Sequence, residues 1–220
     1  MARTVTSLPT VEAALDQLNY AISAGLNHTR CLRRWSEFIR ERDDHRCVDC
    51  HATQHLAAHH ICRKVFLPEA ELQTGNGITL CRDCHREAHQ GFNGRPDLRD
   101  PMDAQGGEKL RYMERLYCIL DQDAVERDML RPGFYELTDQ TLVKFKLFQG
   151  FAPDMVFPGP PIRQACLIWA QTSLNVRKAM AAANGVPMTD DPILPGEAFL
   201  VVGDAEGGQR TVHLKNPEWY

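Results

Sequence analysis

The stretch from residue 47 to residue 89 decides the fold; it contains C-V-D-C (47–50), A-A-H-H-I (57–61), G-N-G-I-T-L (75–80) and C-R-D-C-H-R-E-A-H (81–89). Four of the eight cysteines of the chain form two C-x-x-C pairs here, and six of its nine histidines lie in the same stretch. Thiolate and imidazole groups are the preferred protein ligands of zinc. Their density predicts that metal binding organises this part of the chain.

The two cysteine pairs, Cys47/Cys50 and Cys81/Cys84, have the spacing of a structural zinc site. Two intervening residues allow a tight turn to direct both sulfurs at one point, so that two pairs supply a tetrahedral four-thiolate cage. Such pairs usually lie about 15–20 residues apart, whereas here residues 51–80 intervene, so we expect the zinc to hold the base of a functional excursion. The alternative is redox-active or buried free thiols, but a thioredoxin-like strand–helix context is missing.

The histidines suggest a second site. His85 and His89 are four residues apart with no helix breaker before Gly91, so both can project from one helix face and hold a metal. His59 and His60 follow an apolar segment and are expected in a short strand, where neighbouring side chains point to opposite faces. For both to serve one site, the strand must end or bulge there.

The H-H-I segment, the Asn76 that precedes His85 by nine residues, and L-C-x-x-C-H-x-x-x-H together resemble the zinc-clamped form of the HNH endonucleases, whose fold is a ββα-metal module. The resemblance covers roughly residues 45–94. It implies that His60 is the general base and that His59 is a ligand of the catalytic divalent metal. It further implies that Asn76 holds the loop that orients His60, and that His85 and His89 complete the metal site.

This resemblance implies a metal-dependent endonuclease that hydrolyses phosphodiester bonds of DNA, expected to be double-stranded. A histidine whose pKa is about 6.5 can accept the proton of the attacking water near neutral pH, and a bound cation offsets the charge that develops on the phosphate. Two kinds of metal are expected: Zn²⁺ in the closed thiolate cage, and Mg²⁺ or another divalent metal in an open histidine site. Aspartate often replaces His59 in that family, so the site here is softer than usual.

Two alternatives remain open. One is a catalytically silent zinc module that binds nucleic acid or protein, although such a module has no need of the complete histidine and asparagine set. The other is an enzyme that cuts RNA, although nothing in the sequence reads a 2′-hydroxyl group.

Composition sets bounds on these hypotheses. At 220 residues and 43% hydrophobic content, the chain can bury a core of one or two domains. A net charge of −4 counts against a sequence-independent DNA coat. No apolar run is long enough for a transmembrane helix, so no membrane partner is expected. The first residues lack the apolar core of a secretory signal, and paired C-x-x-C thiols favour a reducing, cytoplasmic location.

The predicted fold class is α+β and mostly helical: a ββα-metal module flanked by helices, with a small C-terminal β-hairpin. We divide the chain into a helical lead-in (1–44), the nuclease module (45–95) and a helical region of unknown role (96–220), and leave homodimerisation open. Apolar periodicity predicts helices at 10–24, 29–42, about 107–130, 138–149 and 162–184, and strands at 198–202 and 211–214.

Several individual residues carry further expectations. Thr10 should cap the first helix and Phe148 should be buried. Gly75 and Gly77 suggest a loop that needs permissive backbone angles. Four cysteines outside the pairs are expected as buried apolar thiols: Cys31, Cys62, Cys118 and Cys166. Eight basic residues could either lie on the solvated surface or contact phosphate groups. They are Arg30, Arg33, Arg34 and Arg40 of the second helix and Arg63, Lys64, Arg82 and Arg86 of the module.

Overall fold

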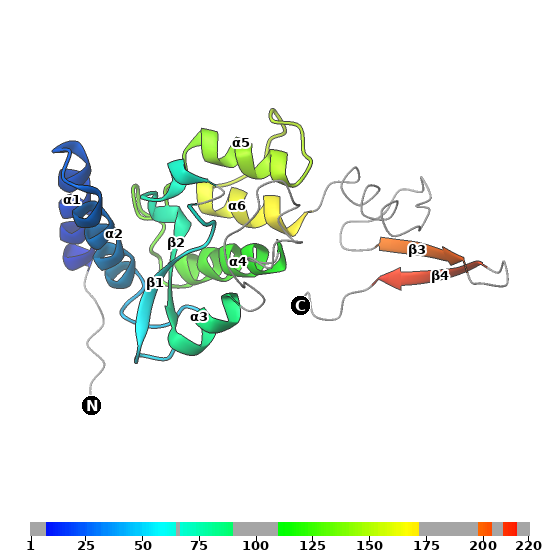
Figure 1. Ribbon diagram of the computed structural model, residues 1–220, viewed down its shortest axis with the longest axis horizontal. Helices are drawn as coiled ribbons and strands as arrows, with labels where there is room; N and C mark the ends of the chain where they lie inside the picture. Colours follow the sequence, from blue (N-terminus) through cyan, green and yellow to red (C-terminus); the bar gives the residue numbers. More distant parts are fainter. Residues whose placement is uncertain (1–7, 65–66, 90–109, 172–197, 204–208, 215–220) are drawn as a thin grey trace.

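The computed structural model describes residues 8–64, 67–89, 110–171, 198–203 and 209–214, without the side chains of 110, 111 and the last two segments. Within these residues the chain is mostly helical and has two small antiparallel sheets, in agreement with the predicted α+β class (Figure 1). The elements in chain order are α1 (Leu8–Ser23), α2 (His28–Arg42), β1 (Leu56–His60), the 3₁₀ turns η1 (Pro68–Ala70) and η2 (Thr74–Asn76), β2 (Gly77–Cys81), α3 (Arg82–Ala88), α4 (Leu110–Glu126), α5 (Asp139–Phe148), α6 (Pro161–Ala170), β3 (Ala198–Gly203) and β4 (Gln209–Leu214).

Helices α1 and α2 form an antiparallel pair at one side of the molecule (Figure 1). Gly25 ends α1 with a φ of +62°, as its position in the sequence predicts, because a side chain at that angle would be strained. Asn27 caps α2, its side-chain oxygen accepting from the amide of Arg30 at 3.0 Å. The prediction that Thr10 caps α1 is wrong, since the helix already includes Leu8.

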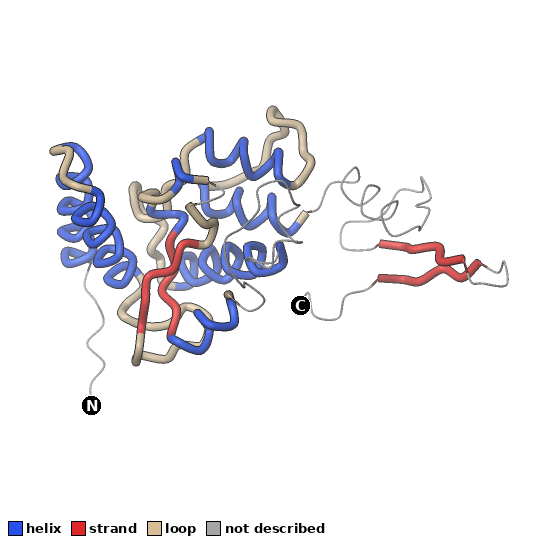
Figure 2. Tube along the Cα trace, in the orientation of Figure 1, coloured by secondary structure: helices blue, strands red, loops and turns tan. Residues whose placement is uncertain are grey.

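Strands β1 and β2 form a hairpin that lies between α2 and α3 (Figure 2). They pair antiparallel without a bulge, with Leu56 opposite Cys81 and His60 opposite Gly77. Alternate side chains of β1 therefore face α2 and α3. All five residues of β2 are buried, which makes this strand part of the core.

Helices α4, α5 and α6 form a layer whose aromatic rings meet in a row. Tyr117 contacts Phe145 with ring centroids 5.4 Å apart, and Phe145 contacts Trp169 at 5.3 Å. Phe148, expected to be buried, is 37% exposed at the end of α5. Helix α6 ends at Ala170, whereas the sequence predicted a helix over 162–184. Residues 172–184 of that prediction lie outside the described residues.

One expectation about the cysteines is wrong. Cys118 and Cys166 are joined by a disulfide rather than being separate apolar thiols. Because α4 and α6 lie side by side, the Cα atoms of the two residues are 4.7 Å apart, which is within the range for a disulfide. Cys31 and Cys62 are buried thiols, as predicted.

The glycines that flank Asn76 serve close packing and not unusual backbone angles. Neither has a positive φ. A Cβ on Gly77 would lie 2.6 Å from side-chain atoms of Trp35 and Ile39, and one on Gly75 would lie 2.8 Å from the carbonyl oxygen of Tyr135. The expectation that these two glycines are needed for permissive backbone angles is therefore wrong. They are needed because a side chain at either position would collide with its neighbours.

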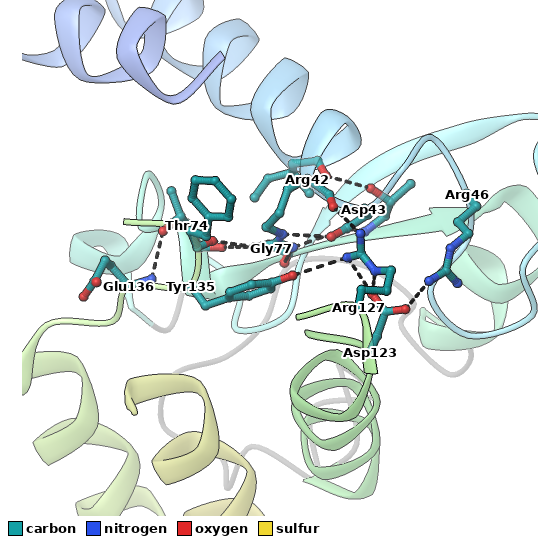
Figure 3. Close-up of polar contacts among 12 residues, drawn as sticks. Arg42, Asp43, Arg46, Thr74, Gly77, Asp123, Arg127, Tyr135 and Glu136 are labelled. Carbon is teal, nitrogen blue, oxygen red and sulfur yellow. Dashed lines mark hydrogen bonds and ion pairs between the residues drawn. The ribbon is translucent and has the colours of Figure 1, made fainter. Parts of the chain in front are cut away.

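A buried arginine ties α2 to the loops on either side of it (Figure 3). Arg42 is fully buried, and its guanidinium binds the carboxylate of Asp43 at 2.8 Å and the carbonyl oxygens of Thr74, Gly77 and Phe134 at 2.7, 2.6 and 3.1 Å. Since the guanidinium meets only acceptors, its charge and its N–H groups are satisfied inside the protein. The start of β2 and the loop after α4 are thereby fixed to the same point.

The charged network continues into α4. Arg127 donates to the carbonyl oxygen of Arg42 at 2.8 Å and pairs with Asp123, which also binds Arg46 (Figure 3). The described helices α1 to α6 and the β1–β2 hairpin share one continuous hydrophobic core. The three predicted regions thus meet in a common interior, so α4 to α6 can influence the metal-binding segment directly.

Candidate functional site

The four cysteines of the two pairs converge on one point. Cys47 and Cys50 precede β1, while Cys81 ends β2 and Cys84 lies in the first turn of α3. Their sulfur atoms all lie within 4.8 Å of one another, and those of Cys50 and Cys81 are 3.6 Å apart. Tetrahedral Zn–S bonds of about 2.3 Å place sulfurs about 3.8 Å apart. The group can therefore hold a metal ion such as zinc.

The local backbone helps these sulfurs to act as thiolates. The amide of Cys84 directs a hydrogen bond at Cys81 and, with smaller contributions, lowers the pKa of that thiol to about 7. Burial instead raises the pKa of Cys47. Burial also raises the pKa of Cys84, so a bound cation would be needed to keep all four sulfurs as thiolates.

An ion pair links this cysteine group to the helical layer. Asp49 lies between the first two cysteines, and both of its carboxylate oxygens accept from Nη2 of Arg115 of α4, at 2.7 and 3.0 Å. Hydrogen bonds between charged groups are stronger than neutral ones. The turn that carries Cys47 and Cys50 is therefore held from α4.

Three histidines form a second group next to the sheet. His59 of β1 contacts both His85 and His89 with ring centroids 4.9 Å apart, and His85 and His89 are 4.6 Å apart. Their ring nitrogens lie within 4.8 Å of one another, and Nε2 of His85 faces Nε2 of His89 at 3.2 Å. Nε2 of His59 is buried and has no hydrogen-bond partner. A buried, unpaired nitrogen beside two others is what a metal ion would satisfy.

The protonation of this group suits metal binding. Burial holds the pKa of His59 well below its usual 6.5, and the neighbouring imidazoles of His89 and His85 lower it further. Burial also lowers the pKa of His85, and it lowers that of His89 to about 4. All three rings are therefore neutral at pH 7, and each has a lone pair to offer a cation.

His60 points to the other side of β1 and does not join that group. Its ring lies face to face with the indole of Trp35, with centroids 4.1 Å apart and 5° between the planes. Its Nε2 is 2.9 Å from the carbonyl oxygen of Glu71. Because a carbonyl oxygen can only accept, Nε2 carries the proton and Nδ1 keeps the free lone pair.

Asn76 is fully buried and connects the chain on both sides of the excursion. Its Oδ1 accepts from the amide of Cys62 at 2.7 Å, and its Nδ2 donates to the carbonyl oxygens of Cys62 and Ala70 at 2.9 and 3.0 Å. Cys62 follows His60 by two residues, and Ala70 precedes Glu71. The asparagine therefore fixes both the end of β1 and the carbonyl that orients His60.

The remaining histidines of the stretch are loop residues. His45, His51 and His55 all have positive φ angles between 47° and 61°, at which they make turns. His51 bonds to Arg46, and His45 pairs with Glu41 at 3.1 Å. Among the described residues, neither group of metal-binding side chains includes them.

Two contacts around His60 were not expected from the sequence. His28 binds the carboxylate of Glu71 at 2.9 Å, and Lys64 binds the same carboxylate at 3.2 Å. The Glu71 side chain is thus held while its carbonyl orients His60. No local spacing signals this pairing, since His28 lies 43 residues before Glu71.

The arginines of α2 are partly neutralised. Arg33 and Arg34 both pair with Glu37, at 2.9 and 2.7 Å, and Arg40 donates to Ser36. This favours the solvated-surface reading for Arg33 and Arg34 over direct phosphate contact.

Comparison of the chain with protein-family models, with curated proteins and with solved structures finds no match. Across the described parts of the chain, every helix is too short or too polar to span a lipid bilayer.

Proposed function

We propose that this protein is a metal-dependent DNA endonuclease of the HNH type, with a catalytic metal on His59, His85 and His89 and with His60 as the general base. The observation that carries the proposal is that His59 and His60, at the end of β1, face opposite sides of the strand and have different partners. His59 faces His85 of α3 and His89 at the end of that helix, while its neighbour His60 is held separately with Nδ1 free.

The two histidines can serve one substrate because β1 ends at His60. A phosphodiester laid across this strand end would meet the three-imidazole group on one side and the His60 ring on the other. The lowered pKa of His60, caused by burial, keeps its ring neutral at pH 7 and ready to accept a proton from water. Nδ1 is the atom that would take this proton, because Nε2 is bound to Glu71.

A divalent cation on His59, His85 and His89 would supply electrostatic stabilisation of the phosphate charge that develops during in-line attack. Three imidazoles without a carboxylate form a borderline-soft site, which favours Zn²⁺ or Ni²⁺ over Mg²⁺. The four-cysteine group would hold a structural Zn²⁺. The thiols of this group favour a reducing location such as the cytoplasm, whereas the Cys118–Cys166 disulfide favours an oxidising one, so the cytoplasm stays a prediction.

A catalytically silent zinc module remains the second candidate function. It would use the cysteine group alone, and the three histidines would be structural. The neutral, partner-free Nε2 of His59 argues against it, because a structural histidine that is buried normally bonds to a protein group.

The deciding experiment is single-turnover cleavage of supercoiled plasmid with Mg²⁺, Mn²⁺, Ni²⁺, Zn²⁺ or EDTA, together with calorimetric metal affinity. A single site should nick one strand first. His60→Ala should keep metal affinity and cut about 10²–10⁴ times more slowly. His59→Ala should lose metal affinity and partly recover at high metal concentration.

His55→Ala serves as the matched control, since His55 lies in the same excursion but outside both metal groups. Cleavage by the wild type that survives EDTA, or equal rates for His60→Ala and the wild type, would refute the proposal. Metal loss in His60→Ala with retention in His59→Ala would reverse the two roles.

A further inference from the structure

A residue outside the stretch 47–89 contacts Asn76, the residue that holds the loop beside His60. Tyr117 of α4 is fully buried, and its hydroxyl donates to Oδ1 of Asn76 at 3.1 Å. The same Oδ1 accepts from the amide of Cys62. With two bonds to Oδ1 and two from Nδ2, the amide of Asn76 uses its full hydrogen-bonding capacity.

These bonds form a continuous path to the proposed base. Tyr117 binds Asn76, Asn76 binds the carbonyl oxygen of Ala70, and the next carbonyl, of Glu71, accepts from Nε2 of His60 at 2.9 Å. Every member of this path is buried or half-buried, so water offers little competition. A tilt of the Asn76 amide would therefore move the carbonyl that orients the His60 ring.

Helix α4 is well suited to hold the hydroxyl still. The residue after Tyr117 is Cys118, which is joined to Cys166 of α6, and one turn further Asp121 pairs with Arg163 of the same helix. The Tyr117 ring also packs against Phe145 of α5. Three contacts from two helices thus fix the position from which the hydroxyl reaches Asn76.

We infer that Tyr117 is a positioning residue of the active site, through which the helical layer of α4 to α6 orients the general base His60. This inference rests on the proposed endonuclease function. It assigns a role in catalysis to a region for which the sequence suggested none, and it places that role on one hydroxyl group.

The test is Tyr117→Phe, which removes the hydroxyl and keeps the ring packed against Phe145. We expect kcat for plasmid nicking to fall about three- to tenfold, the worth of one such hydrogen bond, with KM and metal affinity unchanged. Tyr135→Phe is the matched control: Tyr135 is also buried, at 4% exposed, and its hydroxyl meets Arg127 at 3.4 Å, away from Asn76.

A double-mutant cycle with Asn76→Ala separates positioning from general destabilisation. If Tyr117 acts through Asn76, Tyr117→Phe should have no further effect on kcat in the Asn76→Ala background. The inference is overturned by an unchanged kcat in Tyr117→Phe, by effects that multiply in the double variant, or by an equal loss in Tyr135→Phe.

A second readout does not depend on cleavage. Nitrogen-15 nuclear magnetic resonance of the His60 ring in the metal-free protein should show the proton on Nε2 in the wild type and in Tyr135→Phe, and a mixture of tautomers in Tyr117→Phe. If no metal supports cleavage by the wild type, the proposed function fails, and this spectrum alone decides whether Tyr117 orients His60. An unchanged tautomer in Tyr117→Phe would overturn the inference.

Discussion

The indole of Trp35 stacks on the imidazole of His60, with the ring centroids 4.1 Å apart and the planes within 5° of each other. The indole is itself fixed, since it is 1% exposed and its Nε1 donates to the carbonyl oxygen of Gln73 at 3.1 Å. One face of the His60 ring is therefore closed, and the ring cannot rotate without displacing a buried tryptophan.

If His60 is the general base, as proposed, replacement of Trp35 should slow catalysis in proportion to the stacking surface that is lost. Trp35→Phe keeps an aromatic face and should slow single-turnover nicking severalfold, whereas Trp35→Leu should slow it more. Both variants also lose the bond to Gln73, which costs about 0.5–1.5 kcal/mol of stability. Rates are compared well below each variant's melting temperature, and equal rates for the two variants would argue against a role for stacking.

Removal of one cysteine of the four-cysteine group should unfold the metal-binding stretch. Apparent zinc-binding free energies of about 10–16 kcal/mol in small zinc domains set the scale for Cys81→Ser. Elemental analysis should find one tightly bound zinc in the wild type and none at this site in the variant. Cys31→Ser, which changes a free buried thiol outside the group, should keep the zinc.

The metal-free protein should lose stability as the pH falls from about 6.5 toward about 4. The pKa values of His59, His85 and His89 are lowered in the folded state, that of His89 to about 4, while in the unfolded chain they return to 6.5. Between these values the unfolded chain binds more protons, so stability increases with pH. Urea denaturation at several pH values in EDTA measures this.

The histidines can be separated from other titrating groups by a variant. His89→Gln should reduce the slope of stability against pH in that window, because one proton-binding difference is removed. A slope that stays the same would assign the pH dependence to other groups. Added metal should raise stability at pH 7 and make the loss of stability on acidification steeper, since protons and the cation compete for the same nitrogens.

Arg42→Met should be strongly destabilising. It would leave the fully buried carboxylate of Asp43 and three backbone carbonyl oxygens without their partner, and breaking a buried pair costs about 3–5 kcal/mol. Arg33→Met is the control, because that side chain is 78% exposed and its pair with Glu37 should be worth less than about 1 kcal/mol. Chemical denaturation compares the two.

The sequence was sufficient to predict which cysteines and histidines gather, because most members of each group are only a few residues apart in the chain. The C-x-x-C pairs each depend on one turn, and His85 and His89 on one turn of helix at the end of α3; in the structure the four cysteines form one group and the histidines, with His59, form another. The helices followed from apolar periodicity, with errors at their ends, as at Thr10 and Ala170.

The contacts that orient His60 could not be predicted in this way. Tyr117 lies 41 residues from Asn76, and Cys118 lies 48 residues from Cys166. Such pairs are set by how α4 packs on the hairpin and on α6, and no local pattern encodes that packing. Gly77 shows the same limit: glycine is required there because Trp35 and Ile39 approach closely, and not because of its own backbone angles.

The antiparallel register of β1 and β2 places the adjacent histidines His59 and His60 on opposite sides of the sheet. Whether a histidine faces α3 or α2 depends only on whether its position in the strand is odd or even, since the pairing of Leu56 to His60 has no bulge. Deleting one residue between 56 and 58 should therefore exchange the sides that His59 and His60 face, and with them the proposed roles of ligand and base. A residue added in the loop at 63–64 should leave the side that each histidine faces unchanged.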